Sequence, residues 1–234
     1  MKNFSNTYIF TFSAVMVVLV ALLLSLAAMQ LKPFQDKNIE IEKMQNILAS
    51  IKVNSTPANA QELYKKYVTS SFAVNTSGEK NTNVDAFHVD MKAEMAKPEE
   101  KRTLPVFISK LDNGEEVYIV PLRGKGLWGP IWGYISFKKD LNTIYSTFFD
   151  HQGETPGLGA EIKEHWFQEE FNDKKIFDES GKFVSIEVVK GGAQAGNPHQ
   201  VDAISGGTIT SKGLEEMVKV SLGDYKVFFE KNRQ

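Results

Sequence analysis

The chain has 234 residues and a formal net charge of −2, from 27 Lys and Arg against 29 Asp and Glu, so it carries no strong electric field of either sign. Its basic residues are scattered and not gathered beside aromatic residues, which argues against nucleic acid as a partner. Cysteine is absent and the four histidines lack metal-binding spacing, so thiolate chemistry, iron–sulfur clusters, disulfides and a metal site are not expected, and a redox cofactor would be organic.

The N-terminal segment predicts a membrane-spanning helix. No charged residue occurs from Asn3 to Leu31, and about 20 apolar residues rising 1.5 Å each span a hydrocarbon layer of about 30 Å. The alternative is a cleavable signal peptide, although its apolar region is usually only about 7–15 residues long. Lys2 before the span and Lys32 and Lys37 after it leave the orientation undecided. We assign residues 1–33 to a transmembrane anchor.

Residues 34–83 are expected to form a helical connector. An amphipathic helix is predicted over 36–48, because apolar residues recur there every three or four positions. A second, polar helix is predicted over 60–68, and the small polar residues at 77–83 indicate a loop.

Residues 84–234 are expected to form the main domain, which opens with a series of β-strands. The predicted strands are Ala86–Met91, Leu104–Ser109, Glu116–Leu122, Trp128–Phe137 and Thr143–Phe149. Asn113-Gly114 between two of them is a hairpin signal, since this pair accepts positive φ at little cost.

Helices dominate the remainder of the chain. A helix over 160–171, a strand over 185–189 and a long helix over 211–231 are predicted. The long helix should bury one stripe, formed by Leu214, Met217, Val218 and Leu222. Strands followed by helices indicate an α+β fold, here a mostly antiparallel sheet with flanking helices.

Two loops are candidates for a functional site. In the first, 151–159, glycines allow the backbone to approach a ligand closely, although an ordinary strand-to-helix connection is an equal alternative. The second, 202–211, carries Ser205, Thr208, Thr210 and Ser211 onto the start of the last helix, where free N–H groups and the helix dipole favour a phosphate. Capping of the helix would explain one such hydroxyl, but not all four.

The second loop resembles the flavinylation motif of the FMN-binding family, Asp-x-x-Ser/Thr-Gly-Ala-Ser/Thr-x-Thr, in which a flavin transferase esterifies FMN to the last threonine. The matching positions are Asp202, Ser205, Gly206, Thr208 and Thr210. Gly207 stands where the family usually has alanine, and the loss of this methyl group is expected to loosen the loop slightly without blocking modification.

Other segments extend the resemblance. The loop at 154–159 resembles the second hallmark of this family, whose residues line the flavin. Residues 126–134, the Lys190-Gly191-Gly192 segment and the N-terminal span agree as well. Over essentially its whole length, the chain resembles the family of C subunits of the sodium-translocating NADH:quinone reductases.

The resemblance implies FMN bound covalently through its phosphate to Thr210. Asp202 is expected to order the loop or to support the metal-assisted attack of the transferase. Lys190 either balances a reduced, anionic flavin or is a solvated surface lysine. Trp128 either stacks on the ring or packs in the sheet core. The complete set of expected flavin-binding residues is Thr210, Glu154, Thr155, Gly157, Leu158, Gly159, Lys190, Asp202, Ser205, Gly206, Thr208 and Trp128.

The resemblance also implies a location and partners. We expect a single-pass protein of the bacterial inner membrane, with its soluble domain on the periplasmic side. It would carry electrons singly within a Na⁺-transporting respiratory NADH:quinone reductase, beside the other polypeptides of that complex, with no NADH site of its own; a flavin transferase would act during maturation. The G subunit of the Rnf-type ferredoxin:NAD complex and a cofactor-free, membrane-tethered binding module remain the alternatives.

Overall fold

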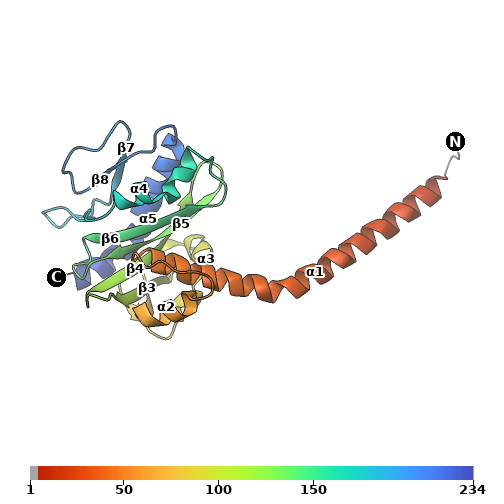
Figure 1. Ribbon diagram of the computed structural model, residues 1–234, viewed down its shortest axis with the longest axis horizontal. Helices are drawn as coiled ribbons and strands as arrows, with labels where there is room; N and C mark the ends of the chain where they lie inside the picture. Colours follow the sequence, from red (N-terminus) through yellow and green to blue (C-terminus); the bar gives the residue numbers. More distant parts are fainter. Residues whose placement is uncertain (1–4, 234) are drawn as a thin grey trace. The chain divides into compact units, whose positions relative to one another are not determined.

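The computed structural model describes residues 5–233 and divides into two compact units, one ending at Lys43 and the other beginning at Met44 (Figure 1). The described part of the first unit is the greater part of a single helix, α1 (Asn6–Ala49), which continues through Pro33. The sequence predicted two helices separated at this proline. Proline removes one backbone hydrogen bond from a helix, but here it does not end it.

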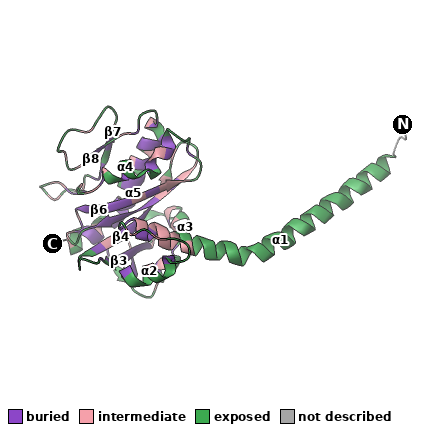
Figure 2. Cartoon of the chain, in the orientation of Figure 1, coloured by how far each residue is buried: buried purple, intermediate pink, exposed green. Residues whose placement is uncertain are grey.

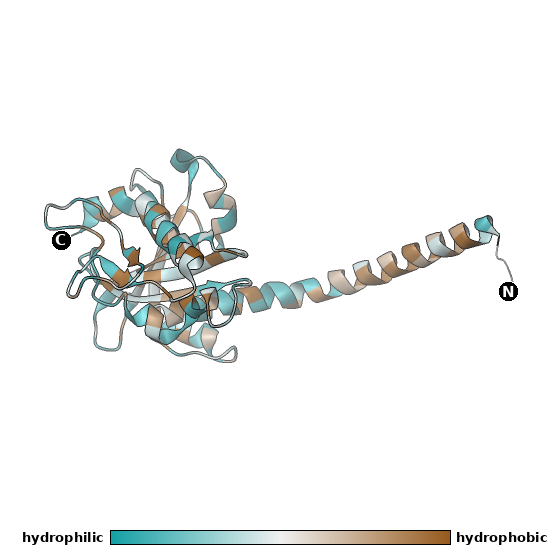
Figure 3. Ribbon diagram, turned by 90° about the horizontal axis from the view of Figure 1, so that it is seen from above, coloured by the Kyte–Doolittle hydropathy of each residue, from teal (hydrophilic) through white to brown (hydrophobic). Residues whose placement is uncertain are grey.

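The first unit is apolar on all sides over much of its length. Its side chains are exposed, and the apolar residues lie along the N-terminal part of α1, with polar ones further on (Figure 3). Among the described residues, α1 is the helix whose length and composition would allow it to cross a membrane. A helix that is apolar all round is typical of a buried or membrane-spanning element.

The second unit is built on a six-stranded antiparallel sheet with the strand order β2-β1-β3-β4-β5-β6. The strands are β1 (Val68–Val74), β2 (Lys80–Asn81), β3 (Leu104–Lys110), β4 (Glu116–Lys125), β5 (Pro130–Phe137) and β6 (Ile144–His151). A separate parallel pair consists of β7 (Glu187–Val189) and β8 (Gln200–Asp202). The predicted α+β fold with a mostly antiparallel sheet is therefore confirmed.

Helices flank this sheet (Figure 1). The α-helices of the second unit are α2 (Ala60–Tyr67), α3 (Met91–Met95), α4 (His165–Glu169) and α5 (Thr208–Asn232). Its short 3-10 helices are η1 (Ala86–His88), η2 (Glu99–Lys101) and η3 (Gly159–Lys163). The predicted stripe of α5, Leu214, Met217, Val218 and Leu222, is buried.

Each face of the sheet packs against a hydrophobic core. Successive side chains of a strand point to opposite faces, so one strand contributes to both cores. In β4, Ile119 belongs to a smaller core that includes Ile47 and Leu48 at the end of α1. Val120 and Leu122 belong to a larger core that includes residues of α5. Figure 2 shows the buried residues running through the strands.

α5 approaches β4 closely because glycines line their crossing. A Cβ atom on Gly213 would overlap the carbonyl oxygen of Lys125, and one on Gly124 would lie 2.5 Å from the Cβ of Met217. A larger residue at either position would push the helix off the strand. The contact places the start of α5 beside the β4–β5 turn at 126–129.

Residues 86–91, predicted as a strand, instead form η1 and the start of α3. The Asp85 carboxylate accepts a hydrogen bond from the Phe87 amide, and the Asp90 carboxylate accepts one from the Lys92 amide. These two caps stabilise helical turns, so the strand prediction was wrong because it weighed apolar spacing above the aspartates.

The predicted helix over 160–171 is interrupted. η3 ends at Lys163, Glu164 is extended with ψ of 142°, and α4 follows. The side-chain amide of Gln168 donates hydrogen bonds to the carbonyl groups of Ile162 and Lys163 at this break and to that of Phe149 on β6. The carbonyl groups of Ile162 and Lys163 are acceptors that a continuous helix would have satisfied internally.

β1 lies inside the segment expected to be a helical connector. No strand was predicted between the helix at 60–68 and the loop at 77–83, but β1 pairs with β3 along its length. Residues 69–71 are exposed while 72–74 are buried. Polar residues are therefore tolerated in the first half of this strand, which obscured it in the sequence.

Candidate flavin site

A pocket of about 250 Å³ lies where three segments of the second unit meet: the β4–β5 turn, the loop between β6 and η3, and the start of α5. It is lined by Leu127, Glu154, Thr155, Leu158, Gly159, Gly206, Gly207, Thr208, Ile209 and Thr210. The structure thus brings together both loops that the sequence singled out, although they are about 50 residues apart along the chain.

A buried carboxylate connects the three segments. The Thr210 hydroxyl donates a hydrogen bond of 2.5 Å to Oε2 of Glu154, and the Trp128 amide donates one of 2.8 Å to Oε1. The Glu154 amide in turn donates to Nδ1 of His151. Glu154 is 4% exposed and Thr210 is 2% exposed. Both oxygens of the carboxylate are therefore held in place by separate parts of the fold.

Two glycines make room for this carboxylate. A Cβ atom on Gly126 would lie 2.5 Å from Oε1 of Glu154. A Cβ atom on Gly159 would overlap the Thr210 hydroxyl and reach 2.5 Å from Oε2 of Glu154. Because such distances are shorter than normal contacts, any larger residue at 126 or 159 would displace the Glu154–Thr210 pair.

The N-terminus of α5 is left without a side-chain cap. Its N-cap residue is Gly207, and no side chain in the described range 5–233 caps it. Thr210 donates to Glu154, and the Ser211 hydroxyl accepts from the Ile204 amide. These two hydroxyls therefore do not cap the helix, and the unpaired N–H groups of the first turn remain suited to an anion such as a phosphate.

These features fit FMN. The uncapped helix start and the adjacent hydroxyl suit its phosphate, and the pocket has both polar and apolar lining residues. Pockets that enclose a drug-sized ligand usually measure about 300–1,000 Å³. A pocket of about 250 Å³ would hold part of a flavin and leave the rest accessible.

Asp202 and Ser205 lie just before the pocket and are exposed. The Asp202 carboxylate accepts a 2.6 Å hydrogen bond from the Ala193 amide, which ties the end of β8 to the glycine-rich loop at 190–196. The Asp202 amide donates to the carboxylate of Glu170. Burial, as the largest effect, raises the pKa of that Glu170 carboxyl. Asp202 is thus hydrogen-bonded to Ala193 in the glycine-rich loop and to Glu170.

Lys190 and Gly157 do not line the pocket. Lys190 lies in the turn after β7, where Gly191 and Gly192 have φ of 92° and 110°. These values are favourable for glycine alone, so the turn depends on both residues. Gly157, at φ of 74°, shapes the loop that carries Glu154.

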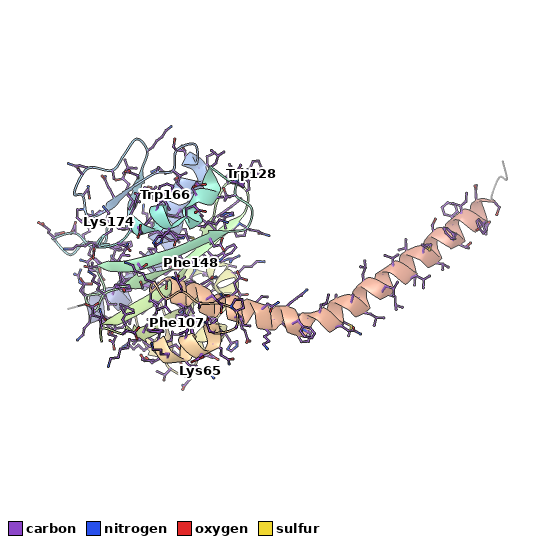
Figure 4. The ribbon with its side chains drawn as sticks, in the orientation of Figure 1. Lys65, Phe107, Trp128, Phe148, Trp166 and Lys174 are labelled. Atoms are coloured by element: carbon purple, nitrogen blue, oxygen red, sulfur yellow. The ribbon has the colours of Figure 1, made fainter. Side chains whose placement is uncertain are left out.

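Trp128 is not in the sheet core. It lies in the β4–β5 turn, its side chain is 69% exposed, and Figure 4 shows it at the periphery of the second unit. Trp128 was predicted on a strand because the apolar residues that precede β5 already begin within the turn. The Gly126 amide donates a hydrogen bond to the Gly129 carbonyl, which closes the turn around Trp128. The core alternative for Trp128 was wrong.

Close packing around position 207 explains the glycine there, which the sequence alone did not reveal. A Cβ atom there would lie 2.9 Å from Cγ2 of Ile204 and 3.2 Å from the carbonyl carbon of Leu158. The two loops therefore touch at this glycine. An alanine at position 207 would require Ile204 or the backbone at Leu158 to move. Glycine therefore allows the two loops to pack closely, and its effect is more than a loosening of the second loop.

Three pocket residues were not in the expected flavin-binding set: Gly207, noted only as a departure from the motif, Leu127 and Ile209. Leu127 and Ile209 are large, apolar and exposed, Ile209 at 61%. With Leu158, which is also exposed, they are the large apolar residues that line the pocket. The signal available in the sequence was a large apolar residue between two threonines at a helix start, where a surface residue is usually polar.

Comparison with known proteins agrees with this geometry. The family model of the FMN-binding domain matches residues 126–223. The C subunit of the Na⁺-translocating NADH-quinone reductase from Haemophilus ducreyi is 33% identical over 226 residues, covering 88% of this chain and 87% of that protein. Its counterpart from Vibrio parahaemolyticus is 31% identical over 224 residues, covering 87% and 85%.

Solved structures give the same result. The crystal structure of the C subunit from Parabacteroides distasonis has a TM-score of 0.78 and 48% identity, covering 85% of this chain and 96% of that one. Shewanella oneidensis NqrC has a TM-score of 0.71 and 27% identity, covering 83% and 98%. The likeness in sequence and in fold extends well beyond the pocket. The chain therefore belongs to the family of C subunits of the Na⁺-translocating NADH-quinone reductases.

Proposed function

We propose that this chain is a membrane-anchored one-electron carrier whose FMN is esterified through its phosphate to Thr210. The observation that carries the proposal is the placement of the Thr210 hydroxyl. It lies in the first turn of an uncapped helix, lines the pocket, and is held there by Glu154. When bound, FMN would supply the ability to accept and donate electrons one at a time.

The remaining site residues have distinct expected roles. Glu154, Thr155, Leu158 and Gly159 would border the flavin or its ribityl chain. Gly206 and Thr208 shape the phosphate side of the pocket, and Gly206 has the positive φ of 76° that glycine accepts readily. Asp202, with Ser205 nearby, orders the motif loop. Lys190, Gly157 and Trp128 lie outside the pocket lining and would act on a flavin only where it extends beyond the pocket.

A covalent ester suits a small and open pocket. Reversible binding at 1 nM requires about −12 kcal/mol of favourable contacts. A pocket of about 250 Å³ encloses too little of a flavin to provide many of them. An ester retains the cofactor without enclosure, so the flavin can stay accessible to electron donors and acceptors.

The anchor and the partners follow from the family. Residues 1–33 would be the membrane anchor, 34–83 the connector and 84–234 the flavin-binding domain. α1 has the length and composition for this, and relatives are subunits of an NADH-quinone reductase. The chain would receive electrons from neighbouring polypeptides and have no NADH site, with its domain on the periplasmic side, where a flavin transferase would modify it.

The cofactor-free alternative is less well supported. It requires the Ser and Thr residues of the loop to serve only as a helix cap. The N-cap of α5 is instead Gly207, without a side-chain hydrogen bond from the described residues. The Rnf-type alternative shares the motifs, but the similarity reported above over most of the chain is to the NADH-quinone reductase proteins.

Intact mass tests the proposal. The full chain, co-expressed with a flavin transferase, should gain the mass of one FMN less one water and fluoresce in a denaturing gel. Thr210→Ala should abolish both signals. Thr69→Ala, which removes an exposed hydroxyl of β1 outside the pocket, is the matched control and should retain both. Loading of the Thr210→Ala variant would refute the assignment of this oxygen.

A further inference from the structure

We propose that Glu154 is a catalytic residue for the maturation of this chain: its carboxylate orients the Thr210 hydroxyl and accepts its proton as the flavin phosphate is transferred. The inference rests on the proposed function, esterification at Thr210. The inference goes beyond the proposed function because it assigns the proton transfer to a residue of this chain and not to the transferase.

The geometry is that of a hydroxyl paired with a base. Oε2 of Glu154 lies 2.5 Å from Oγ1 of Thr210, a distance typical of a strong hydrogen bond between a hydroxyl and a carboxylate. The carboxylate is prevented from turning because its other oxygen accepts from the Trp128 amide at 2.8 Å. A general base must lie within about 2.6–3.2 Å of the group whose proton it removes, and Glu154 is this close before any partner is present.

The fold makes specific provision for the carboxylate. Gly126 and Gly159 leave the space that its two oxygens occupy, because a Cβ atom at either position would come within 2.5 Å of one of them. Among the ion pairs of residues 5–233, none involves Glu154. Burying a carboxylate without a cation is unfavourable. A neutral Gln at position 154 could also bridge Trp128 and Thr210. A role in proton transfer explains why the residue is an acid.

The transfer step balances with a flavin nucleotide as donor. A threonine hydroxyl is a weak nucleophile and requires an adjacent base. FMN alone could form the ester only by losing water, so the donor must be a flavin dinucleotide containing a phosphoanhydride. Oγ1 of Thr210 attacks the flavin-side phosphorus and a new O–P bond forms. The anhydride O–P bond breaks, a nucleoside monophosphate leaves, and the hydroxyl proton passes to Oε2 of Glu154. No electron is gained or lost.

The pocket provides access for this reaction. Thr210 is 2% exposed overall but lines the pocket, so a phosphate that enters the pocket can reach Oγ1. After transfer, Oγ1 has no proton to donate to Glu154. The proton held by Glu154 keeps a second negative charge from facing the new phosphodiester until it is passed to solvent.

Several other titratable groups lie on the elements around Glu154. They are His151 on β6, Lys125 on β4, Glu161 on η3 and Lys212 on α5. His151 contacts the Glu154 amide, not its carboxylate. Glu161 accepts from the Gly157 amide, Lys212 pairs with Glu215, and Lys125 is exposed. Glu154 is therefore the acid in direct contact with the reacting hydroxyl.

The test measures the rate of flavin transfer. Unmodified full chain in detergent is mixed with a purified flavin transferase, its divalent cation and a flavin dinucleotide, and the mass gain is followed over time at pH 5–8. Glu154→Gln should slow transfer by about 10²–10⁴-fold, the usual contribution of a general base, while thermal unfolding shows that the domain remains folded.

Two further variants make the result decisive. Glu154→Asp keeps a carboxylate that can accept the proton and should lose less rate than Glu154→Gln. Glu216→Gln removes a carboxylate of α5 outside the pocket and should leave rate and pH profile unchanged. If Glu154→Gln is loaded at the wild-type rate, or if a folded Glu154→Asp chain is loaded no faster than Glu154→Gln, the inference is overturned.

The two proposals fail in different ways. If wild-type chain is never loaded, or is loaded at an oxygen other than that of Thr210, the proposed function fails. If wild-type chain is loaded on Thr210 and the Glu154→Gln variant matches it, the assignment of Glu154 alone fails. Peptide mapping of each loaded variant by fragmentation distinguishes these outcomes.

Discussion

Replacing Gly159 with alanine should disrupt the contact between Glu154 and Thr210 and destabilise the domain. A Cβ atom at this position would overlap the Thr210 hydroxyl and would lie 2.5 Å from Oε2 of Glu154. The added methyl group can be accommodated only if the Glu154–Thr210 hydrogen bond lengthens or breaks. Gly153→Ala, in the same loop, is the matched control because no atom lies within 4 Å of its Cβ position.

The magnitude follows from two effects. Overpacking a well-packed site costs about 1–3 kcal/mol, and losing a hydrogen bond to a charged group costs about 1.5–3 kcal/mol. Alanine also restricts the unfolded chain more than glycine does, which stabilises the folded state by about 0.4–1 kcal/mol. We therefore expect a net loss of about 1.5–5.5 kcal/mol for Gly159→Ala. For Gly153→Ala only the last effect applies, so stability should be unchanged or rise by about 0.4–1 kcal/mol.

Thermal unfolding of the full chain in detergent measures the difference. For a domain of 150–250 residues, each kcal/mol shifts Tm by about 2–4 °C, so Gly159→Ala should lower Tm by about 3–22 °C. It should also load flavin more slowly than wild type, while Gly153→Ala loads normally. Equal Tm values and equal loading of the two variants would refute the packing argument and the importance of the Glu154–Thr210 contact.

Two further predictions concern the scaffold. Arg102→Met leaves the carboxylate of Asp224, 4% exposed, without its 2.8 Å ion pair and should cost about 3–5 kcal/mol at pH 7 by urea denaturation. Burial already raises the pKa of Asp224, so the folded state binds its proton more tightly than the unfolded chain, and the deficit should shrink as pH falls toward 4. Ser136→Ala removes a 2.6 Å hydrogen bond to the Ser50 carbonyl and should cost about 1–3 kcal/mol. Ser109→Ala, whose hydroxyl is buried without a partner among residues 5–233, should be neutral or stabilising.

Particular outcomes would contradict these two predictions. A deficit of Arg102→Met that is the same at pH 7 and pH 4 would show that the charge of Asp224 is not the cause. A Ser109→Ala variant as unstable as Ser136→Ala would show that volume, and not hydrogen bonding, decides both results.

Much of the fold could be predicted because apolar periodicity follows the buried faces. The strands β3 to β6 and the stripe of α5 were anticipated in this way. The pattern failed where local polar contacts decide the structure. Asp85 and Asp90 cap helical turns in a segment with strand-like spacing, and Gln168 binds three carbonyl groups at the break between η3 and α4.

The site was predictable in its parts and not in its arrangement. Thr210 and the 154–159 loop were found through a family resemblance, since helix-start chemistry alone indicates only a phosphate. The hydrogen bond between Glu154 and Thr210 joins residues 56 positions apart, and spacing cannot reveal it. The exposure of Trp128 also escaped prediction, because it depends on a turn closed by Gly126 and Gly129.

The most direct test of the account is the mass of this chain isolated from native membranes with its associated polypeptides. We expect the intact chain to be heavier by one FMN less one water, with fragmentation placing the whole added mass on Thr210. A chain of unmodified mass, or a flavin attached to any other residue, would contradict the account.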